Sequence, residues 1–323
     1  MKWLLSAMVF GVSVGTASHA LAQAYPVKPI RWVVGFPAGG GTDVIARAIA
    51  QAVTPSLGQP IVIENRTGAA GVIAAEAVAK SPADGYTIFT GDNGILVYNP
   101  MVYKRLPYDP VRDLQPVTMI AHFPLMLAVN SSSPIRTLAD YVATAKKDPG
   151  KLAYGSPGPG SPHHIAMELF KDFAKIDSPH IPYRGGAPAV QDMLAGTLPS
   201  IFIDFVTAQS LIRAGKLRPL AVSTPKRIST LAELPTFVEQ GFPEFVASAF
   251  QGVVVPAGTP RDIVMRLNRE LVAAINSPEI SKRLADMGVE PATSTPEQMV
   301  ELLKSETARW RGIIQSRGIS LEL

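Results

Sequence analysis

The sequence predicts an α/β protein of two lobes, in which two mainly parallel sheets are flanked by helices and a ligand cleft lies at a hinge that the chain crosses twice. The first observation is that short β-branched runs alternate with helical patterns after residue 24, as in βα units. The second is that ten candidate strands are more than one continuous sheet usually holds. Hydrophobic residues make up 47% of the 323 residues, which is enough apolar material for two cores. A single doubly wound domain with long loops is the alternative.

The N-terminal segment, residues 1–24, has the pattern of a secretory signal peptide. Lys2 is followed by an apolar run over residues 3–17, and residues 20–24 supply a small-x-small cleavage site. The apolar run is shorter than the ~20 residues that span a bilayer. We therefore expect cleavage after Ala24 and export. The absence of cysteine from the chain suits a bacterial periplasm.

The expected strands follow one another along the chain, and each is a short β-branched or aliphatic run. They cover residues 30–36, 61–65, 87–91, 117–120, 125–129, 152–155, 180–183, 200–203, 220–223 and 252–255. Residues 43–53 place apolar side chains at four-residue spacing, which predicts a helix packed on the sheet. A hydroxyl residue followed by Pro predicts further helix starts, at Ser161, Thr259, Ser277 and Thr295. The last of these begins a long helix over residues 296–316.

Two extended apolar stretches could carry the chain between the lobes. They are residues 117–129 and 245–255. If both are crossings, the first lobe consists of residues 25–124 and 250–323, and the second of residues 125–249, which are ordinary domain sizes. A double crossing of this kind makes a hinge with a cleft between the lobes.

A glycine-rich loop follows the first strand and is the most informative segment of the sequence. It reads Phe36-Pro37-Ala38-Gly39-Gly40-Gly41-Thr42-Asp43, and a helix opens at Thr42 or Asp43. Glycines permit close backbone approach, so successive N–H groups can converge on one anion at a helix N-terminus. The loop lacks the Gly-Lys-Ser/Thr of a phosphate loop and the glycine spacing of a dinucleotide fingerprint. A carboxylate is therefore the preferred anion, and a tight turn without a ligand is the alternative.

Similar loops of small residues follow other expected strands. They are residues 67–71, 91–94, 155–161 and 184–187. Ligands of open α/β sheets bind at the carboxyl ends of the strands, where these loops lie. Each lobe is therefore expected to offer backbone donors to a shared cleft.

Composition and motifs exclude several other classes of protein. The net charge is only +4 and no run of Lys or Arg occurs, so nucleic acid is not an expected partner. A hydrolase would have to use Ser156 or Ser161, His163 or His164, and Asp204. The two histidines are adjacent on a helix and point about 100° apart, and after residue 24 neither Gly-x-Ser-x-Gly nor His-Glu-x-x-His occurs. We therefore predict no enzymatic activity, no cofactor and no metal, and keep a periplasmic hydrolase as the alternative.

Several segments, read in order, carry a resemblance to a known family. They are residues 25–30, 36–43, 57–66, 82–86, 106–110, 149–152, 182–188, 214–218 and 256–260. Together they resemble the Bug family of extracytoplasmic solute receptors, the substrate-binding subunits of tripartite tricarboxylate transporters. The resemblance covers nearly the whole chain after residue 24.

The resemblance implies a periplasmic-binding-protein (Venus flytrap) fold that closes on a small carboxylate and delivers it to a membrane permease. Ligands of such receptors include di- and tricarboxylates, acidic amino acids and aromatic acids, held by backbone amides, small hydroxyl side chains and bridging waters. A monomer is expected. A ligand sensor that presents the bound acid to a signalling partner is a further alternative.

The resemblance also implies which residues contact the ligand. In the first lobe they are Phe36, Pro37, Ala38, Gly39, Gly40, Gly41, Thr42, Asp43, Gly91, Asp92 and Asn93. In the second lobe they are Ser156, Gly158, Ser161, His164, Tyr183, Arg184, Gly185 and Asp204. Arg184 is the side chain most able to pair with a second acidic group of the ligand. For His164, bracing of the glycine loop is the alternative.

Asp92 departs from the family's pattern, in which Thr or Ser is more usual. A negative charge there would oppose a second carboxylate and favour a ligand with an amine or a hydroxyl group. Alternatively, Asp92 caps the next turn and faces away from the ligand, since Asp favours such turns.

Overall fold

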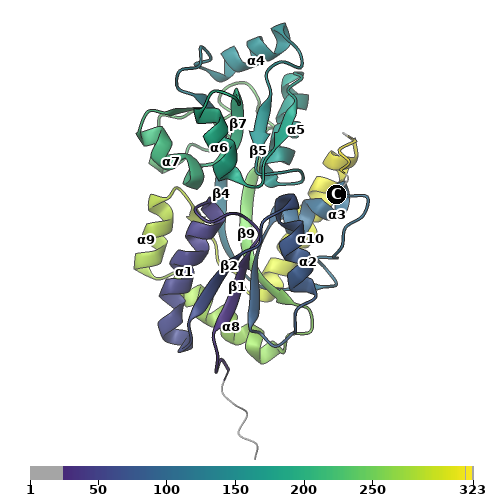
Figure 1. Ribbon diagram of the computed structural model, residues 1–323, viewed down its shortest axis with the longest axis vertical. Coiled ribbons are helices and arrows are strands. Elements are labelled where there is room, and N and C mark those ends of the chain that lie inside the picture. The colour runs from purple at the N-terminus through teal and green to yellow at the C-terminus, as the bar shows by residue number, and fades with distance from the viewer. Residues whose placement is uncertain (1–24, 317, 322–323) are drawn as a thin grey trace, which may run out of the picture.

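The computed structural model describes residues 25–316 and 318–321. The predicted signal peptide lies outside the described residues. Two lobes are stacked along the long axis of the molecule (Figure 1). The α/β, two-lobed fold predicted from the sequence is confirmed.

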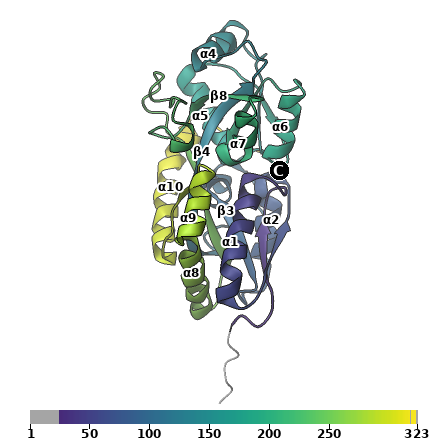
Figure 2. The same ribbon diagram turned by 90° about the vertical axis from the view of Figure 1, so that its left-hand side faces the viewer.

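The first lobe begins with a parallel unit in which β1 pairs with both β2 and β3. Its elements are β1 (Ile30–Val34), α1 (Gly41–Leu57), β2 (Ile61–Asn65), α2 (Val72–Ala79), β3 (Thr87–Asp92), a π-helical turn (Gly94–Tyr98) and α3 (Asn99–Val102). The C-terminal part of the chain returns to this lobe with β9 (Ser248–Pro256), α8 (Arg261–Ile275), α9 (Pro278–Asp286), β10 (Glu290–Pro291) and α10 (Pro296–Ser316). Helices α1, α8 and α9 pack together on one side (Figure 2).

The second lobe contains a smaller parallel unit, in which β5 pairs with β6 and β7. Its elements are α4 (Leu138–Lys147), β5 (Tyr154–Ser156), α5 (Pro162–Ala174), β6 (His180–Pro182), α6 (Gly186–Leu194), β7 (Ser200–Asp204), α7 (Phe205–Arg213) and β8 (Leu217–Val222). In both lobes the carboxyl ends of the parallel strands point toward the other lobe (Figure 1).

One long strand, β4 (Leu114–Asn130), joins the two sheets. As far as Pro124 it pairs with β9 of the first lobe, and from Leu125 it pairs with β7 and β8 of the second. The sequence predicts two strands here, but the backbone stays extended because both segments find partners. The change of partners supports the boundary expected after residue 124, and we retain residues 25–124 with 250–323 and residues 125–249 as the proposed extents of the lobes.

The sheets are mixed, which corrects the expectation of mainly parallel sheets. β4 runs antiparallel to β7, β8, β9 and β10, and β9 runs antiparallel to β3. The reason is that the chain crosses between the lobes as strands. Such crossing strands pair with the parallel units in the opposite direction.

Three of the four predicted helix starts have the expected cap. Ser161 accepts from the backbone N–H of His164, Ser277 caps α9, and Thr295 forms a reciprocal capping box with Gln298. Thr259 does not cap α8, because its hydroxyl donates to the carbonyl of Pro256 and the helix begins two residues later.

Candidate functional site

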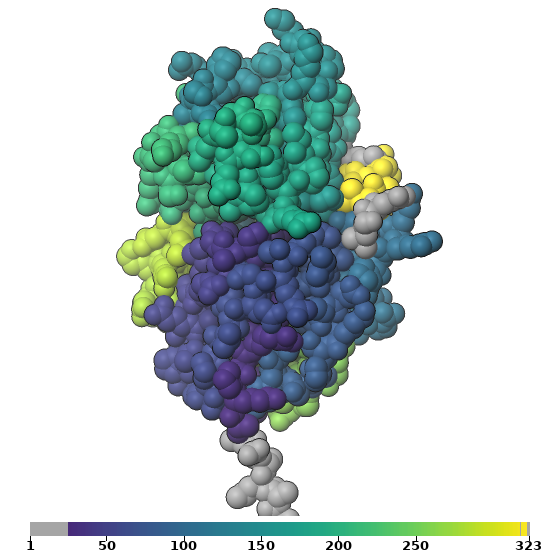
Figure 3. Space-filling view, viewed as in Figure 1, coloured from purple at the N-terminus to yellow at the C-terminus, as the bar shows by residue number. Residues whose placement is uncertain are grey.

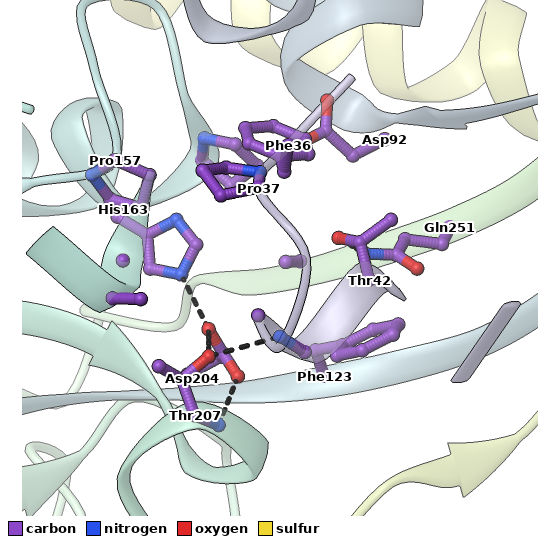
Figure 4. Close-up of a pocket in the computed structure, with 16 residues that line it drawn as sticks. Phe36, Pro37, Thr42, Asp92, Phe123, Pro157, His163, Asp204, Thr207 and Gln251 are labelled. Atoms are coloured by element: carbon purple, nitrogen blue, oxygen red, sulfur yellow. Dashed lines mark hydrogen bonds and ion pairs between the residues drawn. The ribbon is translucent and has the colours of Figure 1, made fainter. Parts of the chain in front are cut away.

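A small cavity of about 40 Å³ lies between the lobes (Figure 4). Its lining residues come from β4, from the ends of β1, β3, β7 and β9, from the loop after β5 and from the first turns of helices in both lobes. They are Phe36, Pro37, Gly40, Gly41, Thr42, Asp92, Phe123, Pro157, Pro162, His163, Gly186, Ala187, Asp204, Thr207, Ala249 and Gln251. None of these residues is Lys or Arg.

Besides the start of α7, which Asp204 caps, three helix N-termini meet at the cavity. Gly41 and Thr42 begin α1, Pro162 and His163 begin α5, and residues 186–187 begin α6. The first N–H groups of a helix have no intrahelical acceptor, and the helix dipole places partial positive charge there. These ends come from both lobes, so the cavity suits an anion that is held from both sides.

Asp204, at the end of β7, is a buried carboxylate with several partners. It accepts from the backbone N–H of Thr207 at 2.8 Å and from its hydroxyl at 2.9 Å. The His163 Nε2 atom lies 3.5 Å from Asp204 Oδ2. Burial alone would raise the pKa of Asp204, but the contacts with His163 and Thr207 outweigh it and hold the pKa below its usual value. Asp204 is therefore ionised at neutral pH.

Asp92, at the end of β3, is a buried carboxylate with fewer partners. Its Oδ1 atom accepts from the backbone N–H of Ile95 at 2.8 Å, and Figure 4 shows no bond between Asp92 and another residue of the cavity. Burial raises the pKa of Asp92 to about 6, although the bond from Ile95 and the nearby His163 oppose the shift. Asp92 does cap the following turn, as one reading of the sequence expects, and it also lines the cavity.

His163 and His164 have different surroundings although they are neighbours. Both ring nitrogens of His163 are buried at the cavity without a hydrogen-bond partner among the described residues. The His164 Nδ1 atom instead accepts from the Gly160 N–H at 3.2 Å, and its ring stacks on His180 at 4.2 Å. Burial lowers the pKa of His164 to about 4, so its ring is neutral. His164 therefore braces the loop, and His163 faces the cavity.

Gln251 extends the polar lining from β9. It lies opposite Asp92 in the antiparallel pair of β3 and β9. Its Nε2 atom donates to Thr42 Oγ1 at 2.6 Å, and its Oε1 atom is buried without a partner.

The structure brings seven of the residues expected at the ligand to the cavity and places the others behind or beside it. Those that line the cavity are Phe36, Pro37, Gly40, Gly41, Thr42, Asp92 and Asp204. Those outside its lining are Ala38, Gly39, Asp43, Gly91, Asn93, Ser156, Gly158, Ser161, His164, Tyr183, Arg184 and Gly185.

Several residues outside the lining hold the loops in shape. Asp43 accepts from the Gly39 N–H at 2.9 Å, and Asn93 donates to the hydroxyl of Tyr98 at 2.6 Å. Ser161 caps α5. Arg184 is exposed to solvent.

Two further side chains outside the lining bond within the second lobe. Ser156 forms a bond with His180 Nε2 at 2.7 Å, and Tyr183 donates to Asp192. Ser156 is buried and His180 is partly buried, and neither belongs to the cavity lining.

The lining residues that were not singled out as ligand contacts from the sequence fall into two groups. Pro157, Gly186 and Ala187 lie in loops that the sequence predicts at the cleft, and Pro162, His163 and Thr207 follow predicted loops or caps, so the loops themselves were a signal. Phe123, Ala249 and Gln251 come from the crossing strands. No local motif marks that second group, because strand pairing alone brings them to the cavity.

The lobes are in direct contact around the cavity. The Gly41 N–H donates to Thr207 Oγ1 at 3.1 Å, and the Tyr103 hydroxyl donates to the Pro159 carbonyl at 2.9 Å. A Cβ atom at Gly41 would lie 2.6 Å from Asp204 Oδ1. In Figure 3 the surfaces of the lobes meet along this seam. The glycine loop therefore permits the lobes to close.

The described residues form neither a metal-binding cluster nor a membrane-spanning helix. No group of three or more His, Asp or Glu side chains there is placed to hold a metal ion. No helix there is long and apolar enough to cross a membrane.

Comparisons with known proteins identify the family. Residues 45–319 match the model of the tripartite tricarboxylate transporter family receptor. The chain is 36% identical to protein BugT of Bordetella pertussis, over 97% of each chain. It is 40% identical to a protein encoded in the tcbD-tcbE intergenic region of Pseudomonas sp. strain P51, over 93% of this chain and 90% of that one.

Solved structures support the same family assignment. An R. palustris protein solved with adipate is 38% identical, with a TM-score of 0.89 over 93% of this chain and all of that one. MatC of Rhodopseudomonas palustris, solved with bound malate, is 30% identical, with a TM-score of 0.85 over 90% of this chain and all of that one. The periplasmic binding protein BugD is 29% identical, with a TM-score of 0.88 over 93% of this chain and all of that one. The resemblance expected from the sequence is thus confirmed, and the chain belongs to the tripartite tricarboxylate transporter receptor family of periplasmic solute-binding proteins.

Proposed function

We propose that this protein is a periplasmic receptor that captures a small carboxylate between its lobes and delivers it to the membrane permease of a tripartite tricarboxylate transporter. The observation that carries the proposal is the meeting of three helix N-termini from both lobes in one cavity, together with the ring of His163, which makes no hydrogen bond among the described residues and contacts Asp204 at 3.5 Å. Adipate and malate, which relatives bind, are both carboxylates.

Capture begins at the first lobe. In an open form, the first turn of α1 at Thr42 offers N–H groups and a hydroxyl to one carboxylate. Closure then adds the first turn of α6 at Ala187 and the ring of His163. The ligand stabilises the closed form only by the difference between its affinities for the two forms. Opening releases it, so the cycle needs no covalent chemistry.

Location and assembly complete the proposal. Residues 1–24 direct export and are removed after Ala24. The mature receptor acts as a monomer, since the cavity is built entirely from the two lobes of one chain. The permease then recognises the closed, loaded receptor.

A thermal-shift panel tests this function. The mature chain is mixed with monocarboxylates, dicarboxylates, aromatic acids, amino acids and sugars, each at several concentrations. A ligand at 100 times its dissociation constant stabilises the folded state by about 2.7 kcal/mol, which is readily measured. We expect one or more acids to raise the melting temperature. A shift with sugars and with no acid would overturn the proposal.

A further inference from the structure

One end of the cavity is lined by hydrogen-bond acceptors. Asp92 and Gln251 are paired in register on the adjacent strands β3 and β9, and both residues line the cavity. Both side chains are about 95% buried, and the Oε1 atom has no donor among the described residues. A buried acceptor without a donor lowers the stability of the folded protein. A ligand that brings a hydrogen-bond donor to this end of the cavity would remove that cost.

The positive groups at the cavity cannot neutralise a second ligand carboxylate. The lining contains two acids, Asp92 and Asp204, and no Lys or Arg. The imidazole of His163 is the one basic side chain of the lining, and it already lies 3.5 Å from Asp204. Arg184, the side chain expected to pair with a second acidic group, is exposed and lies outside the lining.

The three helix N-termini already provide for one carboxylate. A second carboxylate would share a small space with two protein carboxylates. Removing such charges from water without a cation is strongly unfavourable.

Resting on the proposed function, we propose that Asp92 selects the class of acid: the cavity binds a monocarboxylate that also carries a hydrogen-bond donor, a hydroxyl or an ammonium group, and discriminates against dicarboxylates. The carboxylate of the ligand lies at the helix N-termini, and the donor bonds to Asp92 and to Gln251 Oε1. Asp92 attracts the donor group of the preferred ligand and repels the second carboxylate of a dicarboxylate. Discrimination therefore comes from repulsion as well as from attraction. A site that bonds a donor also rejects an analogue without one, since its acceptors are then left unpaired.

The test uses matched acids that differ only at the far end. Succinate, 4-hydroxybutanoate, 4-aminobutanoate and butanoate form one series, and the corresponding five- and six-carbon compounds allow for the length of the cavity. Dissociation constants are measured by calorimetry for the wild type and for Asp92→Asn. Asn keeps an oxygen for the Ile95 N–H and removes the charge. Glu301→Gln, on exposed α10, is the control for a change in net charge.

In the best-fitting series, we expect the wild type to bind the hydroxy or amino acid at least tenfold more tightly than the diacid. Asp92→Asn should reverse or abolish that preference, mainly by tightening diacid binding, and Glu301→Gln should leave it unchanged. Wild-type binding of a diacid as tight as that of its hydroxy and amino analogues would overturn the selection by Asp92 while leaving carboxylate capture standing. If no acid binds either protein, carboxylate capture fails, and the selection by Asp92 fails with it. Melting curves of both variants establish that they are folded.

Discussion

The carboxyl end of β3 in the first lobe and that of β7 in the second are built alike, and yet the pKa values of their carboxyl groups are shifted in opposite directions. Each strand ends in a buried Asp, and each Asp accepts the backbone N–H three residues later, from Ile95 at Asp92 and from Thr207 at Asp204. Asp204 has two further partners, the Thr207 hydroxyl and His163, and its pKa is lowered. Asp92 lacks partners of that strength, and burial raises its pKa to about 6.

The position of each carboxylate and the direction of its pKa shift have different causes. The fold places a carboxylate at the cavity from each lobe. Hydrogen bonds and neighbouring charge then decide whether burial is compensated. Asp204 is thus a buried anion that caps α7, whereas the partners of Asp92 only partly offset its burial.

Removal of Asp204 should have the largest effect on stability. Asp204→Ala deletes the cap of α7 and leaves the Thr207 hydroxyl and the ring of His163 without their partner. We expect a loss of about 3 kcal/mol in the free energy of unfolding, from the cap and the unpaired buried groups together. Urea denaturation at pH 7 measures it. A loss below about 0.5 kcal/mol would show that Asp204 is not held as its contacts indicate.

Asp92→Asn should raise the free energy of unfolding, and the size of this gain should depend strongly on pH. The folded pKa of about 6 lies above the usual value of 3.8, so between these values the folded chain keeps a proton that the unfolded chain has lost. Wild-type stability therefore falls as pH rises through this window. The variant lacks this loss and should be more stable by up to about 3 kcal/mol at pH 7.5 and by nothing at pH 3.5.

Melting temperatures of the two proteins across this pH range measure that difference. A variant that is less stable at every pH would contradict the raised pKa of Asp92.

Gly41→Ala tests the contact that joins the two lobes next to Asp204. The added Cβ would lie 2.6 Å from Asp204 Oδ1 and 3.3 Å from the Cβ of Val206, so the lobes cannot meet as they do. Affinity for the acid found in the thermal-shift panel should fall about tenfold, or about 1.4 kcal/mol, because the closed form is disfavoured.

Gly312→Ala is the matched control for that change. It adds the same methyl group on α10, where nothing lies within 4 Å, and should leave affinity unchanged. Equal affinities for all three proteins would mean that closure at Gly41 is not part of binding.

His163→Gln should have the smallest effect on stability. It removes the imidazole that favours the charged form of Asp204, so the pKa of Asp204 should rise toward its usual value. Because a lowered pKa contributes stability that is lost as pH falls, the variant should lose stability at a higher pH than the wild type on acidification. The cost at pH 7 should be under about 1 kcal/mol. Unchanged acid unfolding would show that His163 does not support Asp204.

Much of this arrangement could be predicted from local pattern. Residues 61–65 and 296–316 form the expected elements at the expected bounds, since β-branched runs and a capping box act within a few residues. The glycine loop at residues 36–43 leads to the cavity because a parallel strand presents its carboxyl end there.

Other features depend on contacts that no local pattern encodes. His163 rather than His164 faces the cavity because of the rotation of α5 about its axis, which packing of the whole helix fixes. Gln251 reaches Asp92 through pairing of strands that are far apart in the chain. The single strand β4 replaces two expected strands because partners from both lobes hold its middle extended.

The most direct test of the central claim is a crystal structure of the mature protein with the tightest-binding acid of the panel. Our account predicts one carboxylate within hydrogen-bond distance of the backbone nitrogens of Thr42 and Ala187 and of the ring of His163, with the other end of the ligand against Asp92. A ligand bound outside this cavity, or one that contacts only one lobe in a closed molecule, would contradict capture between the helix N-termini.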